Sequence, residues 1–293
     1  MLFGILPIVL TPFSESGELD NESLRNLLDF YHSSGADGIT CLGEVSESQF
    51  LSDEEQRKIV QCALDNSKGK PVVSGIWARN LKDAVAKAKE MENFGVNGLL
   101  IPPPEGVRES DEILNFFKEI DRNVSIPIVM LDHPSPSRQS LSPSLVSRIY
   151  RETEQCRFLK IEDPPTNIKI EKIRKEDTEG LTILGASHGR YFYWELEQGA
   201  RGLMTSTTVP ETHVRIWKDF ISGKKEEALN TYMKTLPLCY FMEQIPVEVK
   251  KEIFVIKGII GSSCMRSSKR MLTDSARLQL KELIEWTDNE LKK

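Results

Sequence analysis

The sequence predicts an α/β fold, a (β/α)8 TIM barrel with a C-terminal helical appendage, on three observations. Eight short apolar runs rich in β-branched residues recur at intervals of about 20 to 34 residues, the length of one strand–helix unit. Amphipathic patterns with helical spacing lie between these runs. No G-x-G-x-x-G turn or P-loop follows the first run, as an open nucleotide-binding sheet would require. Eight alternations therefore favour a barrel over an open, doubly wound sheet.

The predicted strands are near-continuous apolar runs, as expected of parallel strands that are covered on both faces. The first run lacks the basic leader and the small-residue cleavage pattern of a signal peptide, so it is also interpreted as a strand. In chain order the strands are Gly4–Leu10, Gly38–Leu42, Pro71–Gly75, Gly98–Ile101, Ile126–Leu131, Arg157–Ile161, Leu181–Leu184 and Gly202–Met204.

The segments between the strands carry helix signals. Apolar residues recur at helical spacing over Leu24–Tyr31, and the pattern ends at Gly35. Ser52 with Glu55 three residues later forms a capping box that opens the next helix. A third apolar stripe covers Ala84–Met91. These patterns predict helices that each present one face to the strands.

The barrel is expected to span residues 1–222, with its eighth helix near Glu211–Ser222. Residues 223–293 then form a helical extension packed on the barrel as part of one structural unit, because no flexible linker or low-complexity segment intervenes. Pro237, Pro246 and Gly261 punctuate its helical patterns. The predicted helices lie around Lys225–Met233, Val247–Ile260 and Asp274–Glu290, and the last would pack through Leu278, Leu283, Ile284 and Trp286.

Composition narrows the class of protein. The 293 residues are 39% hydrophobic and 28% charged, and 38 basic against 44 acidic residues give a net charge of −6. Proteins that bind nucleic acid or anionic membranes present a basic surface, so neither partner is expected. No apolar stretch approaches the ~20 residues that span a bilayer. Five scattered cysteines without a C-x-x-C pair are typical of reduced thiols in the cytoplasm.

Lys160 is the most unusual residue at the predicted strand ends, where barrel enzymes carry their reactive groups. It follows the apolar pair Phe158-Leu159, and desolvation there would favour the neutral amine, a nucleophile toward carbonyl groups. Glu162 lies two residues on, on the same face of the strand, where a carboxylate could shuttle protons during imine formation. The alternative is a lysine that emerges at the strand end and pairs with a surface acid.

His133 is a second candidate for proton transfer. Leu131 and His133 share one face of the fifth strand, so His133 would lie at the barrel mouth if Leu131 faces the axis. The alternative is a loop histidine positioned by neighbouring prolines. Glu44 and Glu47 lie three residues apart on a loop, and as exposed acids they would be unremarkable. The four histidines lack metal-ligand spacing, so no metal site is predicted.

Five short sequence segments are weak family signals when taken singly, but their order and spacing along the chain are specific. They are Ile8-Val9-Leu10-Thr11-Pro12-Phe13, Gly43-Glu44-Val45-Ser46-Glu47-Ser48, Ile101-Pro102-Pro103-Pro104, Leu159-Lys160-Ile161-Glu162 and Gly199-Ala200-Arg201-Gly202-Leu203-Met204-Thr205-Ser206. Together with the C-terminal helices, this order resembles the dihydrodipicolinate synthase / N-acetylneuraminate lyase superfamily of class I (Schiff-base) aldolases. The likeness covers most of the chain.

The resemblance implies that Lys160 forms an imine with a 2-oxo acid such as pyruvate, with no organic cofactor. The loop after the second strand would bind the substrate carboxylate, largely through backbone N–H groups that are fixed before binding. The family usually forms homo-oligomers, so self-association into a tetramer or dimer is expected. The candidate substrate-binding residues are Gly43, Val45, Ser46, Arg138 and Met204.

The departures from the family concern proton transfer. The usual strand-5 tyrosine, which relays protons, falls on Leu131, and the loop threonines fall on Glu44 and Val45. Glu44, His133 and Glu162 could form an altered relay for a different substrate. Alternatively, the barrel is catalytically degraded and acts as a small-molecule-binding or regulatory protein. A metal-dependent aldolase on the same fold is a third interpretation, weakened by the lack of clustered ligands.

An active enzyme is favoured, because the lysine is retained and the substituted positions carry acids and a histidine. We therefore expect a cytoplasmic class I aldolase or lyase. It would join a 2-oxo acid to an aldehyde or cleave the C–C bond between them, or it would break a C–O bond in such a substrate. The identity of the aldehyde and the direction of the reaction stay open. The expected catalytic residues are Lys160, Glu162, His133 and Glu44.

Overall fold

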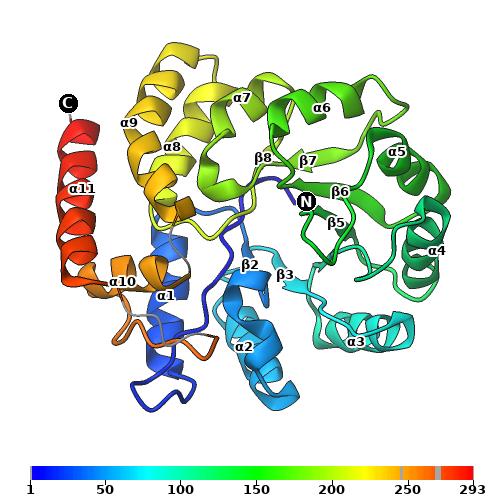
Figure 1. Cartoon of the computed structure of the whole chain (residues 1–293), viewed down its shortest axis with the longest axis horizontal. Coiled ribbons are helices and arrows are strands. Elements are labelled where there is room, and N and C mark those ends of the chain that lie inside the picture. Colours follow the sequence, from blue (N-terminus) through cyan, green and yellow to red (C-terminus); the bar gives the residue numbers. More distant parts are fainter. Residues whose placement is uncertain (1, 245–246, 268–271, 293) are drawn as a thin grey trace.

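The computed structural model describes residues 2–244, 247–267 and 272–292, and its helices surround an inner set of short strands (Figure 1). All eight predicted strands are present, and all but the first keep nearly the predicted bounds. The strands are β1 Gly4–Ile5, β2 Ile39–Cys41, β3 Val72–Gly75, β4 Gly98–Ile101, β5 Ile128–Asp132, β6 Cys156–Ile161, β7 Thr182–Leu184 and β8 Gly202–Leu203.

The strands pair in parallel with their neighbours in the chain. β2 to β7 form a six-stranded sheet in chain order, and β1 pairs with β8. Single bridges, Ile8 with Thr40 and Gly185 with Leu203, join the two sheets. The result is a curled set of parallel strands covered by helices, in agreement with the predicted α/β class.

The predicted length of the first strand, Gly4–Leu10, is wrong. Pro7 has no backbone N–H and cannot continue a regular ladder, so the strand stops at Ile5. The chain nevertheless stays extended between its two neighbours, because the N–H of Ile8 donates to the Thr205 carbonyl at 2.9 Å. This segment therefore still contributes to the inner face.

A helix follows each strand, and the predicted helix signals hold. Ser52 accepts a hydrogen bond from the N–H of Glu55, whose side chain accepts one from the N–H of Ser52, so the capping box is confirmed. The helices of this part are α1 Asn21–Ser33, α2 Asp53–Asp65, α3 Leu81–Phe94, α4 Ser110–Asp121, α5 Pro143–Glu152, α6 Thr166–Arg174, α7 Phe192–Glu197 and α8 Pro210–Ile221, with short 3₁₀ turns η1 Glu44–Ser46, η2 Ser48–Phe50 and η3 Ser187–Gly189.

Alternation along the strands divides the buried apolar residues between two faces. In β5, Ile128 and Met130 join the large cluster beneath the helices, whereas Leu131 joins a separate inner cluster. Phe158 of β6 joins the same inner cluster, and Leu131 lies opposite Lys160 in the β5–β6 register. The inner face therefore carries Lys160 above a layer made of Leu2, Leu6, Ile8, Val73, Leu100, Val129, Leu131, Phe158, Leu184 and Met204.

Three further helices, α9 Lys225–Gln244, α10 Val247–Ile256 and α11 Asp274–Lys292, lie at one side of the molecule (Figure 1). The rings of Phe254 in α10 and Phe30 in α1 pack edge to face with centroids 6.0 Å apart. The expected interruption at Pro237 is wrong, because α9 continues through it. Burial of Leu238 and Met242 against α10 and α11 offsets the lost helical hydrogen bond. The interruption expected at Pro246 lies outside the described residues.

The predicted packing face of α11 is only partly right. Ile284 is buried and Leu283 packs beside it, but Leu278 and Trp286 are 59% and 45% exposed. The buried positions Leu280, Ile284 and Thr287 follow a spacing of four and three residues, which defines one helical stripe. Leu278 precedes that stripe by two residues, about 200° around the helix, and therefore faces away.

Candidate active site

Lys160 lies on the inner face near the end of β6, as predicted from the strand pattern. Its side chain is only 7% exposed, and its Nζ is 2.8 Å from Oε2 of Glu162. The other oxygen of Glu162 accepts the N–H of Ser187 at 3.3 Å. The lysine is thus a buried amine with an internal carboxylate partner, and the alternative of a strand-end lysine paired with a surface acid does not describe it.

Glu162 is held in its charged form. Burial alone would raise its pKa, but the positive charges of Lys160 and His133 outweigh burial and lower the pKa of Glu162 to about 2. A carboxylate with such a low pKa is a weak base. It therefore suits the role of counter-ion to the Lys160 ammonium, or to a positively charged imine, better than that of a proton shuttle.

His133 follows β5 directly, and its Nδ1 lies 3.0 Å from Oε2 of Glu44. This hydrogen bond raises the pKa of His133 above its ordinary 6.5, against the effect of burial, and the charge of Glu162 adds to the rise. An imidazole can both take and give a proton, because both of its protonation states are accessible in proteins. Of the predicted residues, His133 has the properties that best suit acid–base chemistry.

Glu44, in η1, is bound by two basic side chains. Besides His133, Nη2 of Arg138 lies 2.5 Å from Glu44 Oε1. Burial would raise the pKa of Glu44, but His133 and Arg138 lower it, so this side chain is also a carboxylate. The guanidinium of Arg138 stacks 5.3 Å from the ring centre of Trp77, whose Nε1 donates to the Leu42 carbonyl at 2.6 Å.

The loop between β2 and α2, predicted to bind a carboxylate, begins with a glycine for steric reasons. A Cβ on Gly43 would lie 2.5 Å from Cγ2 of Ile8, well inside van der Waals contact. The N–H groups of Glu44 and Val45, the first residues of η1, have no acceptor within the turn. These two donors are the part of the loop that suits a carboxylate.

Ser46, predicted to bind substrate, is used within the loop itself. Its hydroxyl donates to the Val9 carbonyl at 2.5 Å, and its carbonyl accepts the Thr11 hydroxyl at 2.6 Å. Its N–H bonds to the Gly43 carbonyl at 3.1 Å. Ser46 therefore ties the loop to the segment after β1, and its side chain has no spare donor.

Glu47 is not the exposed acid that the sequence suggests. It is 2% exposed, and its Oε2 lies 2.7 Å from Nζ of Lys251, which is itself fully buried in α10. Its Oε1 accepts the N–H groups of Arg266 and Ser267 at 2.9 and 2.8 Å. The C-terminal extension thus covers the loop. The sequence around Glu47 could not predict this contact, because Lys251 lies 204 residues further along the chain.

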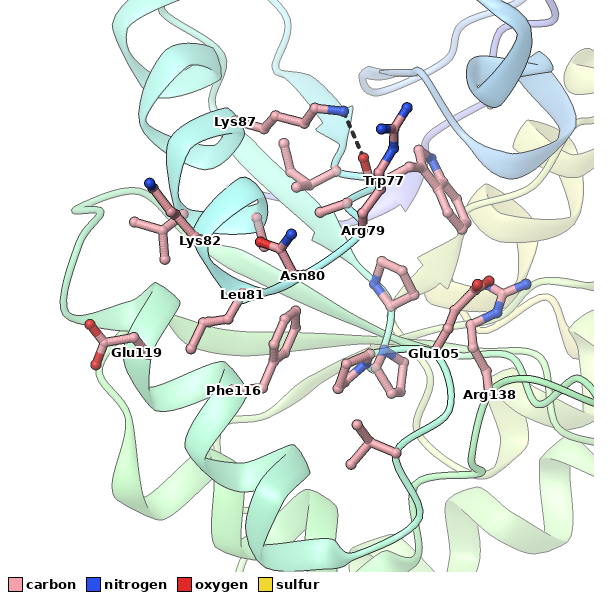
Figure 2. A pocket seen from close by; sticks show the side chains of 18 of the residues that line it. Trp77, Arg79, Asn80, Leu81, Lys82, Lys87, Glu105, Phe116, Glu119 and Arg138 are labelled. Atoms are coloured by element: carbon pink, nitrogen blue, oxygen red, sulfur yellow. Dashed lines mark hydrogen bonds between the residues drawn. The ribbon is translucent and has the colours of Figure 1, made fainter.

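A groove of about 1470 Å³ opens beside Glu44, Trp77 and Arg138 (Figure 2). These three residues form one part of its lining. The rest of the lining comes mainly from α3, α4 and the loops that precede them, and Figure 2 shows Trp77 and Arg138 on the same side of the groove. Lys160 is not among the lining residues. Glu44 lines the groove and binds His133, and His133 is close enough to Glu162 and Lys160 to be affected by their charges, so the groove adjoins the cluster around Lys160.

The remaining predicted residue, Met204, is fully buried in the inner apolar layer with Leu131. Both residues form the apolar floor beneath Lys160 and offer no polar group to a substrate. Within residues 2–244, 247–267 and 272–292, no group of three or more His, Cys, Asp or Glu side chains is arranged to hold a metal ion.

Glu195 is a buried acid that the sequence analysis missed. It lies in α7 with no exposed surface, and its Oε1 accepts the Thr166 hydroxyl at 2.6 Å. It fills the space behind the end of β7, since a Cβ on Gly185 would lie 1.9 Å from Glu195 Oε2. Gly185 is the one sequence signal for this close approach, and a single glycine does not predict a buried acid.

Replacing Glu195 with glutamine is expected to remove a pH dependence of stability. Burial raises the pKa of Glu195 to about 8 from 4.5. Between these values the unfolded chain loses the proton while the folded protein keeps it, so wild-type stability falls by up to about 1.4 kcal/mol per pH unit. Urea unfolding between pH 5 and pH 8 should show Glu195→Gln gaining on the wild type as pH rises. The exposed Glu226→Gln is the control, and equal slopes in all three proteins would contradict this assignment.

Comparison with known proteins agrees with this geometry. A model of the dihydrodipicolinate synthetase family matches residues 1–287. A 4-hydroxy-tetrahydrodipicolinate synthase from Syntrophobacter fumaroxidans is 26% identical over 289 residues, covering 96% of this chain and 97% of that protein. An L-2-keto-3-deoxyarabonate dehydratase from Azospirillum brasilense is 26% identical over 293 residues, with 94% and 92% covered. The crystal structure of dihydrodipicolinate synthase from Rhodopseudomonas palustris has a TM-score of 0.92 at 28% identity over 97% of each chain. The chain belongs to the dihydrodipicolinate synthetase family.

Proposed function

We propose that this protein is a class I aldolase or lyase in which Lys160 forms a Schiff base with a 2-oxo acid such as pyruvate. The observation that carries the proposal is the buried Lys160 amine, 2.8 Å from the Glu162 carboxylate on the inner face of the parallel strands. Once the Lys160 ammonium has given up a proton, its amine attacks the 2-oxo carbon, water leaves, and the positive imine takes the place of the ammonium beside Glu162. The imine then accepts the electron pair of a breaking C–C or C–O bond.

The other residues of the cluster would bind substrate and move protons. The N–H groups of Glu44 and Val45 would receive the carboxylate of the oxo acid. His133, with its raised pKa, would exchange protons with the reacting carbon or the partner's hydroxyl, the task for which Leu131 has no suitable group. Glu44 would hold His133 in place through the 3.0 Å contact.

We also propose that the strands close into a (β/α)8 barrel over residues 1–222, with residues 223–293 as a helical extension of the same unit. The two single bridges that join the sheets support closure. The buried pair of Glu47 and Lys251 supports a single unit, since it joins the extension to the barrel loop. Unfolding in a single cooperative step, seen equally by fluorescence and circular dichroism, is the expected result. Two separate transitions would count against one unit.

The proposed imine can be trapped directly. The protein is incubated with pyruvate and a panel of other 2-oxo acids, reduced with borohydride and weighed intact, and the modified peptide is then sequenced. One adduct per chain, on Lys160, is the expected result. The absence of an adduct with every 2-oxo acid would favour the second candidate, a binding protein without catalysis, for which the buried Leu131 at the family's tyrosine position is the specific observation. Activity lost to a chelator would favour the metal-dependent route.

His133→Asn is expected to lower kcat by about 10² to 10⁴-fold, the usual contribution of a general acid–base group. Trapping of pyruvate on Lys160 should persist in this variant, because Lys160 and Glu162 are unchanged. In the wild type, the rate should change with pH as His133 titrates. The midpoint of that change should lie above pH 6.5, because the hydrogen bond with Glu44 raises the pKa of His133. Unchanged kcat and an unchanged pH profile in His133→Asn would contradict this role.

We propose that the protein self-associates and works in the cytoplasm, as the family resemblance implies. Phe50 and Leu81 support self-association, since they leave 43% and 38% of their surfaces exposed near the groove. Light scattering should give a mass of two or four chains, and the 33.3 kDa mass of one chain would contradict this.

The five free cysteines support a reducing compartment, and a disulfide in freshly isolated protein would count against it. Among the described residues, no helix is long and apolar enough to cross a bilayer.

A further inference from the structure

Building on the proposed function, we infer that the oxo acid's partner is a neutral, hydroxylated aldehyde, so that the joined substrate is a 2-keto-3-deoxy sugar acid and not a dicarboxylate. The two compounds place different groups beyond the reacting bond, a hydroxylated carbon in one and a second carboxylate in the other. We place Glu44 and Arg138 at this end, because both line the groove and Glu44 binds His133, whose charge acts with that of Lys160 on Glu162.

Arg138 is already committed to another carboxylate. An arginine at the mouth of a site commonly binds an anionic substrate group through its planar fork. Here Nη2 is 2.5 Å from Oε1 of Glu44, Nε bonds to the Ser135 hydroxyl at 3.4 Å, and the guanidinium stacks on Trp77. Arg138 is 4% exposed, so a second carboxylate would have to displace Glu44 from its ion pair with a buried guanidinium.

Glu44 itself makes the mouth unfavourable for another anion. Its carboxylate is 39% exposed and lines the groove, so a substrate carboxylate approaching Arg138 would meet it at close range. A hydroxyl group meets no such repulsion and can donate to Glu44. The buried Nη1 of Arg138 has no hydrogen-bond partner among the described residues, which leaves one donor for a neutral oxygen.

The reaction of such a substrate balances without any further reagent. The Lys160 amine and the 2-oxo group form the imine and release water. His133 takes the proton of the 4-hydroxyl while the C3–C4 bond breaks, its electron pair passes to the imine as an enamine, and an aldehyde leaves. Protonation at C3 and hydrolysis then return pyruvate and the free lysine. Dehydration is the lyase alternative. His133 takes a C3 proton from the intact imine to give an enamine that still carries C4, and returns that proton to the 4-hydroxyl, which leaves as water. Hydrolysis of the resulting unsaturated imine then frees the lysine.

Two substrates that differ at one carbon test the inference. 2-Keto-3-deoxypentonate and 4-hydroxy-2-oxoglutarate share the first four carbons, and their fifth carbon is a hydroxymethyl group in one and a carboxylate in the other. Their consumption by the purified full-length protein is followed by mass spectrometry, which registers cleavage and dehydration alike. We expect kcat/KM to be at least tenfold higher for the sugar acid, a ratio that one charged group can produce.

Glu44→Gln supplies the second arm of the test. The amide keeps the size and much of the hydrogen bonding of Glu44, removes the repulsion, and frees Arg138 for a carboxylate. The preference for the sugar acid should therefore fall at least tenfold, chiefly through a lower KM for 4-hydroxy-2-oxoglutarate. The matched control is Glu112→Gln, an exposed acid on the α4 side of the same groove, which should keep the wild-type ratio.

The outcomes separate this inference from the proposed function. Pyruvate trapping in the wild type and in Glu44→Gln reports on the imine and on folding without involving the fifth carbon. If pyruvate is trapped but the wild type prefers the dicarboxylate, consumes neither compound, or keeps its ratio in Glu44→Gln, the substrate class is wrong and the imine chemistry stands. If pyruvate is not trapped in the wild type, the proposed function fails and the substrate class fails with it.

Discussion

Lys160→Arg is expected to abolish borohydride trapping and to lower kcat/KM by at least about 10³-fold, as the loss of a covalent nucleophile does. The guanidinium keeps a positive charge beside Glu162, so the buried carboxylate is not left without a partner. It stays protonated, however, and cannot attack a carbonyl. The substitution therefore separates the charge of Lys160 from its nucleophilicity, which an alanine would not do.

The control for this variant is Lys82→Arg, an exposed lysine that lines the groove. It should keep the adduct and the wild-type kcat/KM. Circular dichroism and the unfolding midpoint should match the wild type in both variants. An adduct of normal mass in Lys160→Arg would show that another amine reacts, and peptide sequencing would then identify it.

The inner face of the site could be predicted because alternation along a strand is a local property. Lys160 and Glu162 are two residues apart on β6, and Leu131 and His133 are two apart on β5, so their shared faces follow from spacing alone. The pairing of His133 with Glu44 could not be predicted in this way. It depends on how the loops after β2 and β5 fold across the strand ends, and loop geometry is weakly encoded in spacing.

Burial of charge was the property that the sequence concealed most. Glu47 and Glu195 look like ordinary acids in the sequence, yet both are enclosed, one by the C-terminal extension and one behind β7. The wrong face chosen for α11 has a related cause. Leu278 and Trp286 are as apolar as the buried Ile284, and only the position of α9 and α10 decides which stripe is covered.

Lys251→Met is expected to lower the free energy of unfolding by about 3–5 kcal/mol, the usual loss when one partner of a buried ion pair is removed. Nζ of Lys251 lies 2.7 Å from Glu47 Oε2 and donates to the Cys264 carbonyl at 2.7 Å. It also lies 4.4 Å from the ring centre of Phe13. Methionine fills a similar volume but leaves the buried Glu47 carboxylate without its cationic partner.

The size of this loss can be checked against the partner and against a surface lysine. Glu47→Gln with Lys251→Met removes both charges, so the double variant should recover much of the loss, since a buried pair replaced as a whole costs little. Lys281→Met, exposed on α11, should change stability by less than about 0.5 kcal/mol. Urea denaturation at neutral pH measures the wild type, the two single variants Lys251→Met and Glu47→Gln, the double variant and the Lys281→Met control. A double variant as unstable as the sum of the single ones would contradict the pairing.

The same pair links the extension to the site, so the loss should also be visible in substrate binding. Glu47 directly follows η1 in the left-handed conformation, with φ of 56°, and the contact with Lys251 holds the loop whose first N–H groups would bind the oxo-acid carboxylate. Lys251→Met, assayed where it remains folded, should therefore raise the pyruvate concentration needed for half-maximal trapping, and the double variant should lower it again. An unchanged concentration in both variants would mean that the extension stabilises the fold without setting the geometry of the loop.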